Sequence, residues 1–218
     1  LKNIVDKNDI GVIKMEVSRS TNPNINFLKE IREICDSKNI ILIFDECTSG
    51  FRETYGGIHL KYGIDPDMSI FGKALGNGYA ITAVIGKSKY MEAAQNTFIS
   101  STFWTERIGS VAGLATLEVM KKEKSWEKIS KIGTKVSDGW RNLFNKYELN
   151  HFIGGIKPIP FFKFNYKNNL LYKTFNTQEM LRRGFLASNL FFASTVHTDK
   201  IISRYFKELE KPIKIIRE

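Results

Sequence analysis

The sequence predicts an α/β fold with a mostly parallel sheet, followed by a small C-terminal α+β domain. Residues 40–44, IILIF, are apolar at every position, which is typical of a strand that is covered on both faces in a parallel sheet. A strand at 11–17 comes before it. Between residues 23 and 38, apolar side chains recur at helical spacing, so strand, helix and strand make a βαβ unit. The pattern changes after about residue 130, where a different arrangement of strands and helices begins.

The remaining elements of the first domain follow from composition. A loop rich in glycine and polar residues covers 48–66 and is followed by a short strand, a stretch of small residues, a second strand and a helix with one apolar face. We expect the short strand at 68–71, the small residues at 72–78, the second strand at 81–86 and the helix at 107–121.

A long helix at 125–147 connects the two parts of the chain. We place the domain boundary within it, near residue 130, which divides the chain into 1–130 and 131–218.

The second domain is expected to contain a strand, a helix, a short strand and a last helix. Asn176 and Glu179 have the spacing of a capping pair for the first of those helices. The predicted ranges are 159–164, 178–189, 190–193 and 198–209.

Composition bounds the class of protein. The chain has 218 residues, of which 42% are hydrophobic, enough for a real core, and this excludes intrinsic disorder. Two cysteines, Cys35 and Cys47, cannot make a disulfide scaffold, and three scattered histidines have no zinc-ligand spacing. No apolar run approaches the roughly 20 residues of a membrane-spanning helix. We therefore expect a soluble cytoplasmic protein without a metal site, and the initial Leu1 suggests a processed product or a fragment.

The net charge of +10 raises the alternative of a nucleic-acid-binding module. Basic residues alternate with acidic ones at 121–124 and 207–211, as on a solvated helix surface. Most phenylalanines lie within apolar runs, where core packing explains them. The charge therefore favours an ordinary surface over a nucleic-acid partner.

Two charged residues follow predicted strands directly. Asp45 comes after IILIF, and Lys73 comes after MSIFG and among small residues. Ligands of parallel α/β sheets gather at the carboxyl ends of the strands, so both residues are candidates for chemistry. The alternatives are a buried ion pair between them, or a lysine in a solvated turn.

Three common motifs are absent. Asp67 stands where a phosphate-binding P-loop needs glycine, and Ala74 replaces its Ser or Thr. Ile108 stands where a nucleophile elbow needs glycine, and no G-x-G-x-x-G follows a strand. Nucleotide kinases, serine hydrolases and dinucleotide dehydrogenases are therefore disfavoured.

The segment IILIFDECTSGFRETYGGIHLKYGIDPDMSIFGKALGNGYAITAVIG resembles the class III aminotransferases, which include glutamate-1-semialdehyde aminomutase. Their pattern is an apolar strand ending in Asp-Glu-Val, a Thr-Gly-Phe-Arg-like turn, a Gly-x-x-Pro-Asp segment and a Gly-Lys followed by glycines. STFWTERIGSVAGLATL is similar to their Gly-Thr-Phe-x-x-Asn-Pro segment, and RRGFLAS continues the resemblance. It implies the pyridoxal-phosphate-dependent transferase fold of type I, with a partial large domain.

The resemblance implies a role for each matching residue. Lys73 would form the internal aldimine with pyridoxal 5'-phosphate and carry the proton through a quinonoid intermediate. Asp45 would pair with the pyridine nitrogen and keep it protonated. Cys47 would pack on the ring face; a cysteine that reacts with the cofactor aldehyde and a simple core cysteine are the alternatives. Thr48 would contact the phenolic oxygen. Thr102 would reach the phosphate of the neighbouring subunit, with an ordinary helix N-cap as the alternative.

Two further positions depart from or extend this pattern. Glu106 and Arg107 replace the family's Asn-Pro, and Glu16 and Arg19 are candidates for substrate-side contacts only.

The family resemblance also implies partners and missing parts. The phosphate-cradling loop, the stacking aromatic residue and the N-terminal substrate segment of the family precede the first strand seen here. We expect a homodimer that acts on an amino donor and a carbonyl acceptor, with neither a membrane nor a nucleic acid as partner. A chain without those segments would be poorly active unless another piece completes the site. The reaction is amino transfer or intramolecular migration; other pyridoxal-phosphate chemistry and a catalytically silent relative remain as alternatives.

Overall fold

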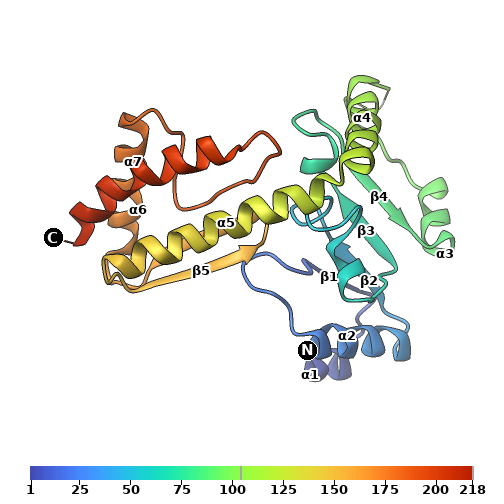
Figure 1. Ribbon diagram of the computed structural model, residues 1–218. Helices are drawn as coiled ribbons and strands as arrows, with labels where there is room; N and C mark the ends of the chain where they lie inside the picture. Colours follow the sequence, from blue (N-terminus) through green and yellow to red (C-terminus); the bar gives the residue numbers. More distant parts are fainter. Residues whose placement is uncertain (104, 218) are drawn as a thin grey trace. The chain divides into compact units, whose positions relative to one another are not determined.

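The computed structural model describes residues 1–103 and 105–217 (Figure 1). The chain divides into two compact units, Leu1–Lys124 and Ser125–Glu218, which we describe separately. The division lies at Lys124, whose left-handed backbone (φ 49°) ends one helix just before the next begins. The expected boundary near residue 130 therefore lies inside the second of these helices.

A four-stranded sheet forms the centre of the N-terminal unit, in the order β1-β2-β3-β4. The first three strands are parallel and β4 runs antiparallel to β3, which confirms the predicted mostly parallel sheet. Its elements are β1 (Val12–Met15), α2 (Ile25–Ser37), β2 (Ile41–Asp45), β3 (Met68–Phe71) and β4 (Ala83–Gly86).

Shorter elements and one long helix complete this unit (Figure 1). The long helix, α4, begins close to where the sequence predicts a helix, whereas the short helices were not predicted. These elements are α1 (Lys2–Lys7), the 3-10 helix η1 (Ile58–Lys61), η2 (Lys73–Leu75), α3 (Ser88–Met91), η3 (Glu92–Asn96) and α4 (Ile108–Glu123).

The apolar run of β2 places one face of this strand in the core. Leu42 and Phe44 are fully buried on one face, whereas Ile41 and Ile43 on the other face are only half-buried. The expectation of equal cover on both faces therefore holds for one face within the described residues. Burying such aliphatic and aromatic side chains stabilises the strand by about 2 kcal/mol each.

Helix α4 packs closely on the segment that follows η2. A Cβ added at Gly109 would lie only 2.4 Å from the carbonyl oxygen of Ala80 and 3.2 Å from Ile81. The absence of a side chain at Gly109 thus lets the helix approach this backbone, which in turn braces the turn that begins at Lys73.

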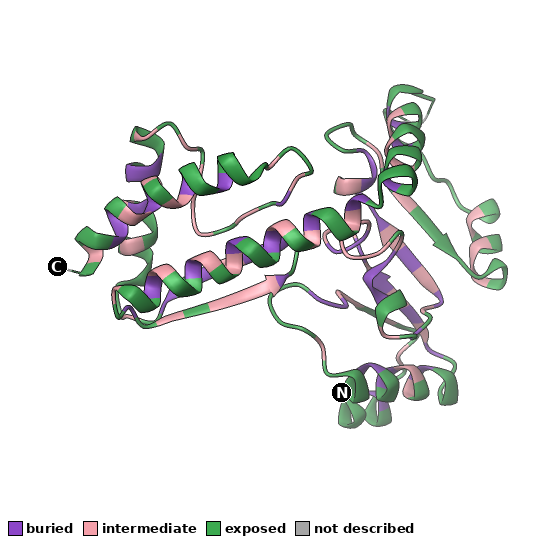
Figure 2. Cartoon of the chain, in the orientation of Figure 1, coloured by how far each residue is buried: buried purple, intermediate pink, exposed green. Residues whose placement is uncertain are grey.

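The C-terminal unit consists of a two-stranded antiparallel sheet and three helices. One face of the long helix α5 is buried and the opposite face is exposed (Figure 2). The elements are α5 (Ser125–Lys146), β5 (His151–Ile156), β6 (Ile159–Phe164), α6 (Asn169–Arg182) and α7 (Asp199–Arg217).

An aromatic cluster forms the core of this unit. Phe162 of β6 contacts Trp140 and Phe144 of α5, with ring centroids 4.9 Å apart in each pair. The Trp140 indole donates a hydrogen bond of 2.8 Å to the hydroxyl of Tyr205, so its polar atom is satisfied within the core. Strand β6 begins and ends as predicted.

Strand β5 was not predicted from the sequence. Its central pair Gly154 and Gly155 has low strand propensity, and Gly155 has a positive φ of 95°. Pairing with β6 over the full length of both strands forms this strand, so its cause is tertiary rather than local.

The predicted helix at 178–189 is wrong, because α6 begins at Asn169 and ends at Arg182. Asn176 and Glu179 therefore do not cap it. Asn176 is fully buried within the helix, and its amide has no hydrogen-bond partner among the described residues. Glu179 pairs instead with the guanidinium groups of Arg182 and Arg183, at 2.6 and 2.5 Å. Two adjacent leucines near the start of the helix, Leu170 and Leu171, are exposed rather than buried, so the first turn shows no apolar face at helical spacing.

Two other expectations in this unit change. Residues 190–193 form no strand, only a single bridge between Leu190 and Phe161. Helix α7 continues to Arg217, beyond the predicted end at 209, with Pro212 inside it.

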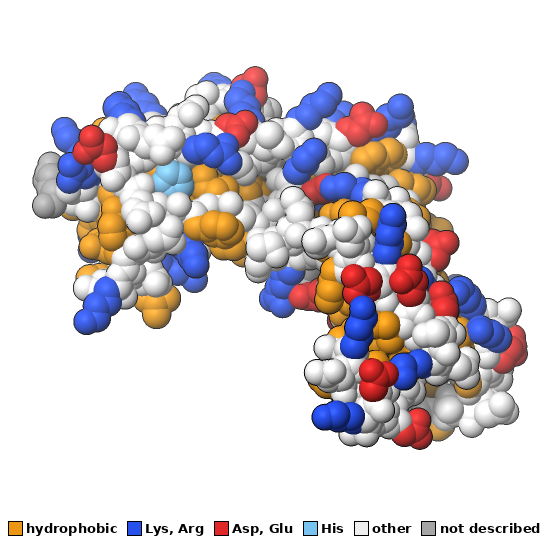
Figure 3. Space-filling view, turned by 90° about the horizontal axis from the view of Figure 1, so that it is seen from below, with side chains coloured by type: hydrophobic (Ala, Val, Ile, Leu, Met, Phe, Trp, Pro, Cys, Tyr) orange, Lys and Arg blue, Asp and Glu red, His pale blue; other side chains and the backbone are white. Residues whose placement is uncertain are grey.

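Basic and acidic side chains are interspersed over the face shown in Figure 3, as the sequence pattern predicts. Among the described residues, no helix has the length and apolar character needed to cross a membrane.

Candidate active site

The carboxyl ends of β2 and β3 bring the sequence-predicted residues together. Asp45 is the last residue of β2 and lies beside Ile70 of β3 in the register of the sheet. Lys73 follows β3 and begins η2 with a φ of 45°, a left-handed conformation that a side-chain-bearing residue rarely adopts. Such strain is concentrated at functional sites.

Lys73 does not pair with Asp45. Its exposed ammonium donates a hydrogen bond of 3.0 Å to the hydroxyl of Thr48, in the loop after β2. Within the described part of the chain, the structure shows no ion pair for Lys73. The alternative of a buried Asp45–Lys73 ion pair is therefore wrong, and the amine is accessible.

Asp45 is held by two other groups. One carboxylate oxygen, Oδ2, lies 2.9 Å from the ammonium of Lys14 on β1, and the other, Oδ1, accepts the backbone N–H of Cys47 at 3.2 Å. The hydrogen bond from Lys14 lowers the pKa of Asp45, against the opposing effect of burial. Asp45 is therefore ionised at neutral pH.

Cys47 lies between the two strand ends. Burial, together with the negative charge of Asp45, raises the pKa of its thiol, so the group is neutral. A Cβ at Gly72 would occupy a space bounded by the Cys47 sulfur at 3.5 Å and the Thr82 methyl at 3.4 Å. Glycine leaves this space, next to Lys73, open.

Glu46 organises the loop after β2 although the sequence analysis did not select it. Its side chain is fully buried and accepts the backbone N–H groups of Ile58 (2.9 Å) and His59 (3.0 Å), and it also bonds to the Ser49 hydroxyl and the His59 ring. Burial acts to raise the pKa of Glu46, but the hydrogen bonds from His59, Ser49 and Ile58 outweigh it and lower that pKa. Thr48 lies in the loop held this way.

Asp67, in the Pro-Asp pair before β3, fastens the sheet. Its nearly buried carboxylate accepts the N–H of Leu42 at 2.9 Å and pairs with Arg32 at 3.1 Å and Lys87 at 2.7 Å. These bonds join α2, β2 and the end of β4 at the amino end of β3. The role of Asp67 is thus structural.

The other predicted residues lie outside this group. Thr102 is exposed in the segment before α4 and does not cap it. The Glu106 carboxylate does so instead, accepting the N–H groups of Ile108 (2.7 Å) and Gly109 (3.2 Å). Glu106 thus closes this helix end without the Asn-Pro pair.

Glu16 and Arg19 follow β1 and form an ion pair at 3.3 Å. Arg19 is mostly exposed, so the pair lies at the surface just past the strand that carries Lys14. Lys14 itself was missed; its position in a strand that neighbours β2, on the same side as Asp45, was the available signal.

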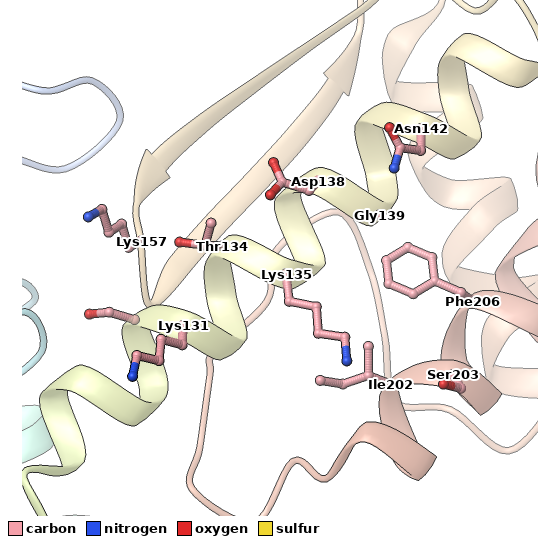
Figure 4. Close-up of a pocket in the computed structure, with 11 residues that line it drawn as sticks. Lys131, Thr134, Lys135, Asp138, Gly139, Asn142, Lys157, Ile202, Ser203 and Phe206 are labelled. Carbon is pink, nitrogen blue, oxygen red and sulfur yellow. The ribbon is translucent and has the colours of Figure 1, made fainter.

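A hollow of about 710 Å³ lies in the C-terminal unit between α5 and α7 (Figure 4). Lys131, Lys135 and Phe206 are among its lining residues. Its lining contains none of the site residues predicted from the sequence.

Comparisons with known proteins identify the family of this chain. The family model described as "Aminotransferase class-III" matches residues 20–158. A 3-aminobutyryl-CoA aminotransferase of Cloacimonas acidaminovorans is 32% identical, over 90% of this chain and 47% of its own length. A glutamate-1-semialdehyde 2,1-aminomutase of Chloroherpeton thalassium is 30% identical, over 82% of this chain and 45% of its own length. The chain spans about half the length of these relatives.

Solved structures show the same fold. The FumI protein of Sphingopyxis sp. MTA144, in a PLP internal aldimine form, superposes with a TM-score of 0.92 at 21% identity, over 99% of this chain and 54% of that one. A transaminase with PLP bound superposes with a TM-score of 0.88 at 19% identity, over 99% of this chain and 55% of that one. The predicted transferase fold of type I is confirmed for this part of the structure.

Proposed function

Because the chain belongs to the class-III aminotransferase family, we propose that it carries the lysine and aspartate of a pyridoxal 5'-phosphate site for amino-group transfer or migration. The observation that carries this proposal is the accessible Lys73, in strained backbone at the end of β3 and beside an ionised Asp45 at the end of β2. The unit Leu1–Lys124 would be the C-terminal part of the cofactor-binding domain, and Ser125–Glu218 the small domain.

The residues present fit this cofactor. Lys73 supplies an exposed amine for the aldehyde, and Asp45 supplies a carboxylate for a protonated ring nitrogen. The neutral thiol of Cys47 lies next to Gly72 and would offer a small apolar surface to the face of the ring. Thr48 adds a hydroxyl that already reaches the lysine and is suited to the ring's phenolic oxygen.

When bound, pyridoxal phosphate accepts the electron pair that is released when a substrate Cα–H bond breaks. Asp45 would hold the proton on the ring nitrogen, because its lowered pKa keeps it anionic. Lys73 would hold the cofactor and, once released, use Nζ as the base that takes the proton from the substrate Cα. Thr48 would orient Nζ by the hydrogen bond it makes now. An amino donor and a carbonyl acceptor are the substrates this chemistry requires.

Exposed apolar side chains on α4 support a homodimer. Ile108, Val111 and Leu114, spaced three residues apart, are each more than 60% exposed. A second copy that covers this face would bring the exposed Thr102 segment, just before α4, close to the interface.

Val111→Asp is expected to reduce the molar mass measured by light scattering after size-exclusion chromatography to that of a monomer, because a charge in an apolar interface is not compensated. Leu186→Asp changes an even more exposed apolar residue of the C-terminal unit and is the control, with unchanged mass. The same mass for both variants and the wild type would contradict the interface.

Lys73→Ala is expected to abolish attachment of the cofactor. The chain is incubated with substoichiometric pyridoxal phosphate, reduced with borohydride and mapped by peptide mass spectrometry, and its visible absorbance is recorded first. We expect one pyridoxyl adduct, at Lys73, and loss of the visible band by at least tenfold in the variant, because the attaching amine is gone.

Lys2→Ala is the matched control, since Lys2 is also exposed and lies in the same unit. It should retain both the band and the adduct. An unchanged band in Lys73→Ala, or adducts spread evenly over the surface lysines, would refute the assignment.

A further inference from the structure

We propose that the Lys14 ammonium pairs with the Asp45 carboxylate until the cofactor binds. The cofactor's ring nitrogen and this ammonium would then exclude each other at the same carboxylate. This inference rests on the proposed function. It makes Lys14 a positioning residue that sets cofactor affinity, a role that the sequence analysis assigned to no residue.

The two oxygens of Asp45 are held differently. Oδ1 accepts the backbone N–H of Cys47 at 3.2 Å, a donor fixed by the chain. Oδ2 bonds to the Lys14 ammonium at 2.9 Å, a donor on a flexible four-carbon stem. Only Oδ2 can therefore change partner without movement of the backbone.

Lys14 can leave at little cost. Its side chain is 55% exposed, whereas that of Asp45 is 24% exposed, so the ammonium can regain water while the carboxylate stays in place. Exposed ion pairs of this kind are weak. The charge of Glu16, two residues further along the chain, also helps to raise the pKa of Lys14, so Glu16 offers the displaced ammonium another anion.

The charged and titratable groups around Asp45 come from three places. Lys14 lies on β1 and Glu16 just after it, and Cys47 follows β2. Lys73 follows β3; its charge lowers the pKa of Cys47, and it does not bond to Asp45. Lys14 is thus the cation that contacts the carboxylate in the unloaded chain. The ring nitrogen of a bound cofactor would compete with this ammonium for Oδ2.

Lys14→Met tests the exclusion by the sign of its effect. The probe is pyridoxamine 5'-phosphate, which has the ring and the phosphate but no aldehyde, so its binding does not require attachment to Lys73. Simple loss of a positive charge would weaken binding of this anion. Loss of a competitor should instead lower its dissociation constant roughly two- to fivefold, as measured by calorimetry.

Lys2→Met is the matched control, because it removes one exposed lysine that pairs with a carboxylate (Glu30, 3.0 Å) away from Asp45. Its affinity should equal that of the wild type or be slightly weaker. Lys14→Arg keeps a competing cation and should not tighten binding.

A second readout needs no cofactor. Carbon-detected NMR titration of Asp45 in the unloaded chain should show its pKa rising in Lys14→Met and unchanged in Lys2→Met. Binding with the same or weaker affinity in Lys14→Met, or an unmoved Asp45 pKa, overturns the exclusion and leaves the proposed function standing. No binding by any variant overturns the proposed function and the exclusion with it.

Discussion

Glu46→Gln is expected to lower the free energy of unfolding of the Leu1–Lys124 unit by about 3 kcal/mol at pH 7. The Glu46 side chain is fully buried and accepts hydrogen bonds from Ile58, His59 and Ser49. A glutamine presents an NH2 group where one carboxylate oxygen accepts, so two donors would face each other without water. The loop that contains Thr48 should loosen as a result.

The effect should depend on pH. The folded-state pKa of Glu46 is lowered, so its stabilising contribution is fully present above the unfolded value of about 4.3 and is lost as pH falls through the folded pKa. The difference in unfolding free energy between wild type and Glu46→Gln should therefore be largest at neutral pH and narrow below about pH 4.

Urea unfolding followed by circular dichroism, with amide hydrogen exchange at Ile58 and His59, measures both effects. Glu30→Gln is the control, since Glu30 is exposed and pairs with Lys2 at the surface. It should change stability by less than about 0.5 kcal/mol. Equal losses in the two variants, or unchanged exchange at Ile58 and His59, would show that Glu46 does not hold this loop.

Phe162→Ala should destabilise the Ser125–Glu218 unit by about 4 kcal/mol. The Phe162 side chain is 1% exposed and packs edge-on against Trp140 and Phe144. Removing the ring loses its burial and leaves a cavity that two rigid aromatic neighbours cannot fill. Urea unfolding followed by tryptophan fluorescence reports on this core through Trp140.

Phe161→Ala is the matched control from the same strand. Phe161 points to the opposite face of β6, is only partly buried and contacts Phe152 at a centroid distance of 5.9 Å. A loss of about 1 kcal/mol is expected there. Similar losses for the two alanine variants would contradict a core centred on Phe162.

The strands and helices with strong local patterns were predicted from the sequence. The run at 40–44, the helix after Asn24 and strand β6 were placed well because apolar periodicity and turn residues report directly on local structure. Strand β5 was not, because its glycines have no preference for a strand and it forms by pairing with β6. The range predicted for helix α6 was wrong because the apolar residues of this helix do not form a clear face at helical spacing.

The site followed the same division. The positions of Asp45 and Lys73 after apolar runs were enough to place these two residues at neighbouring strand ends, whereas Lys14 and Glu46 were not selected from the sequence. The sequence alone determined the parallel sheet, these two strand ends and the family. Only the tertiary structure decided that Lys73 bonds to Thr48, that Lys14 forms an ion pair with Asp45, and that Glu46 is buried beneath the loop. The reason is physical: periodicity encodes which face of an element is buried, whereas the partner of a charged side chain depends on which neighbours the assembled strands bring within hydrogen-bonding distance.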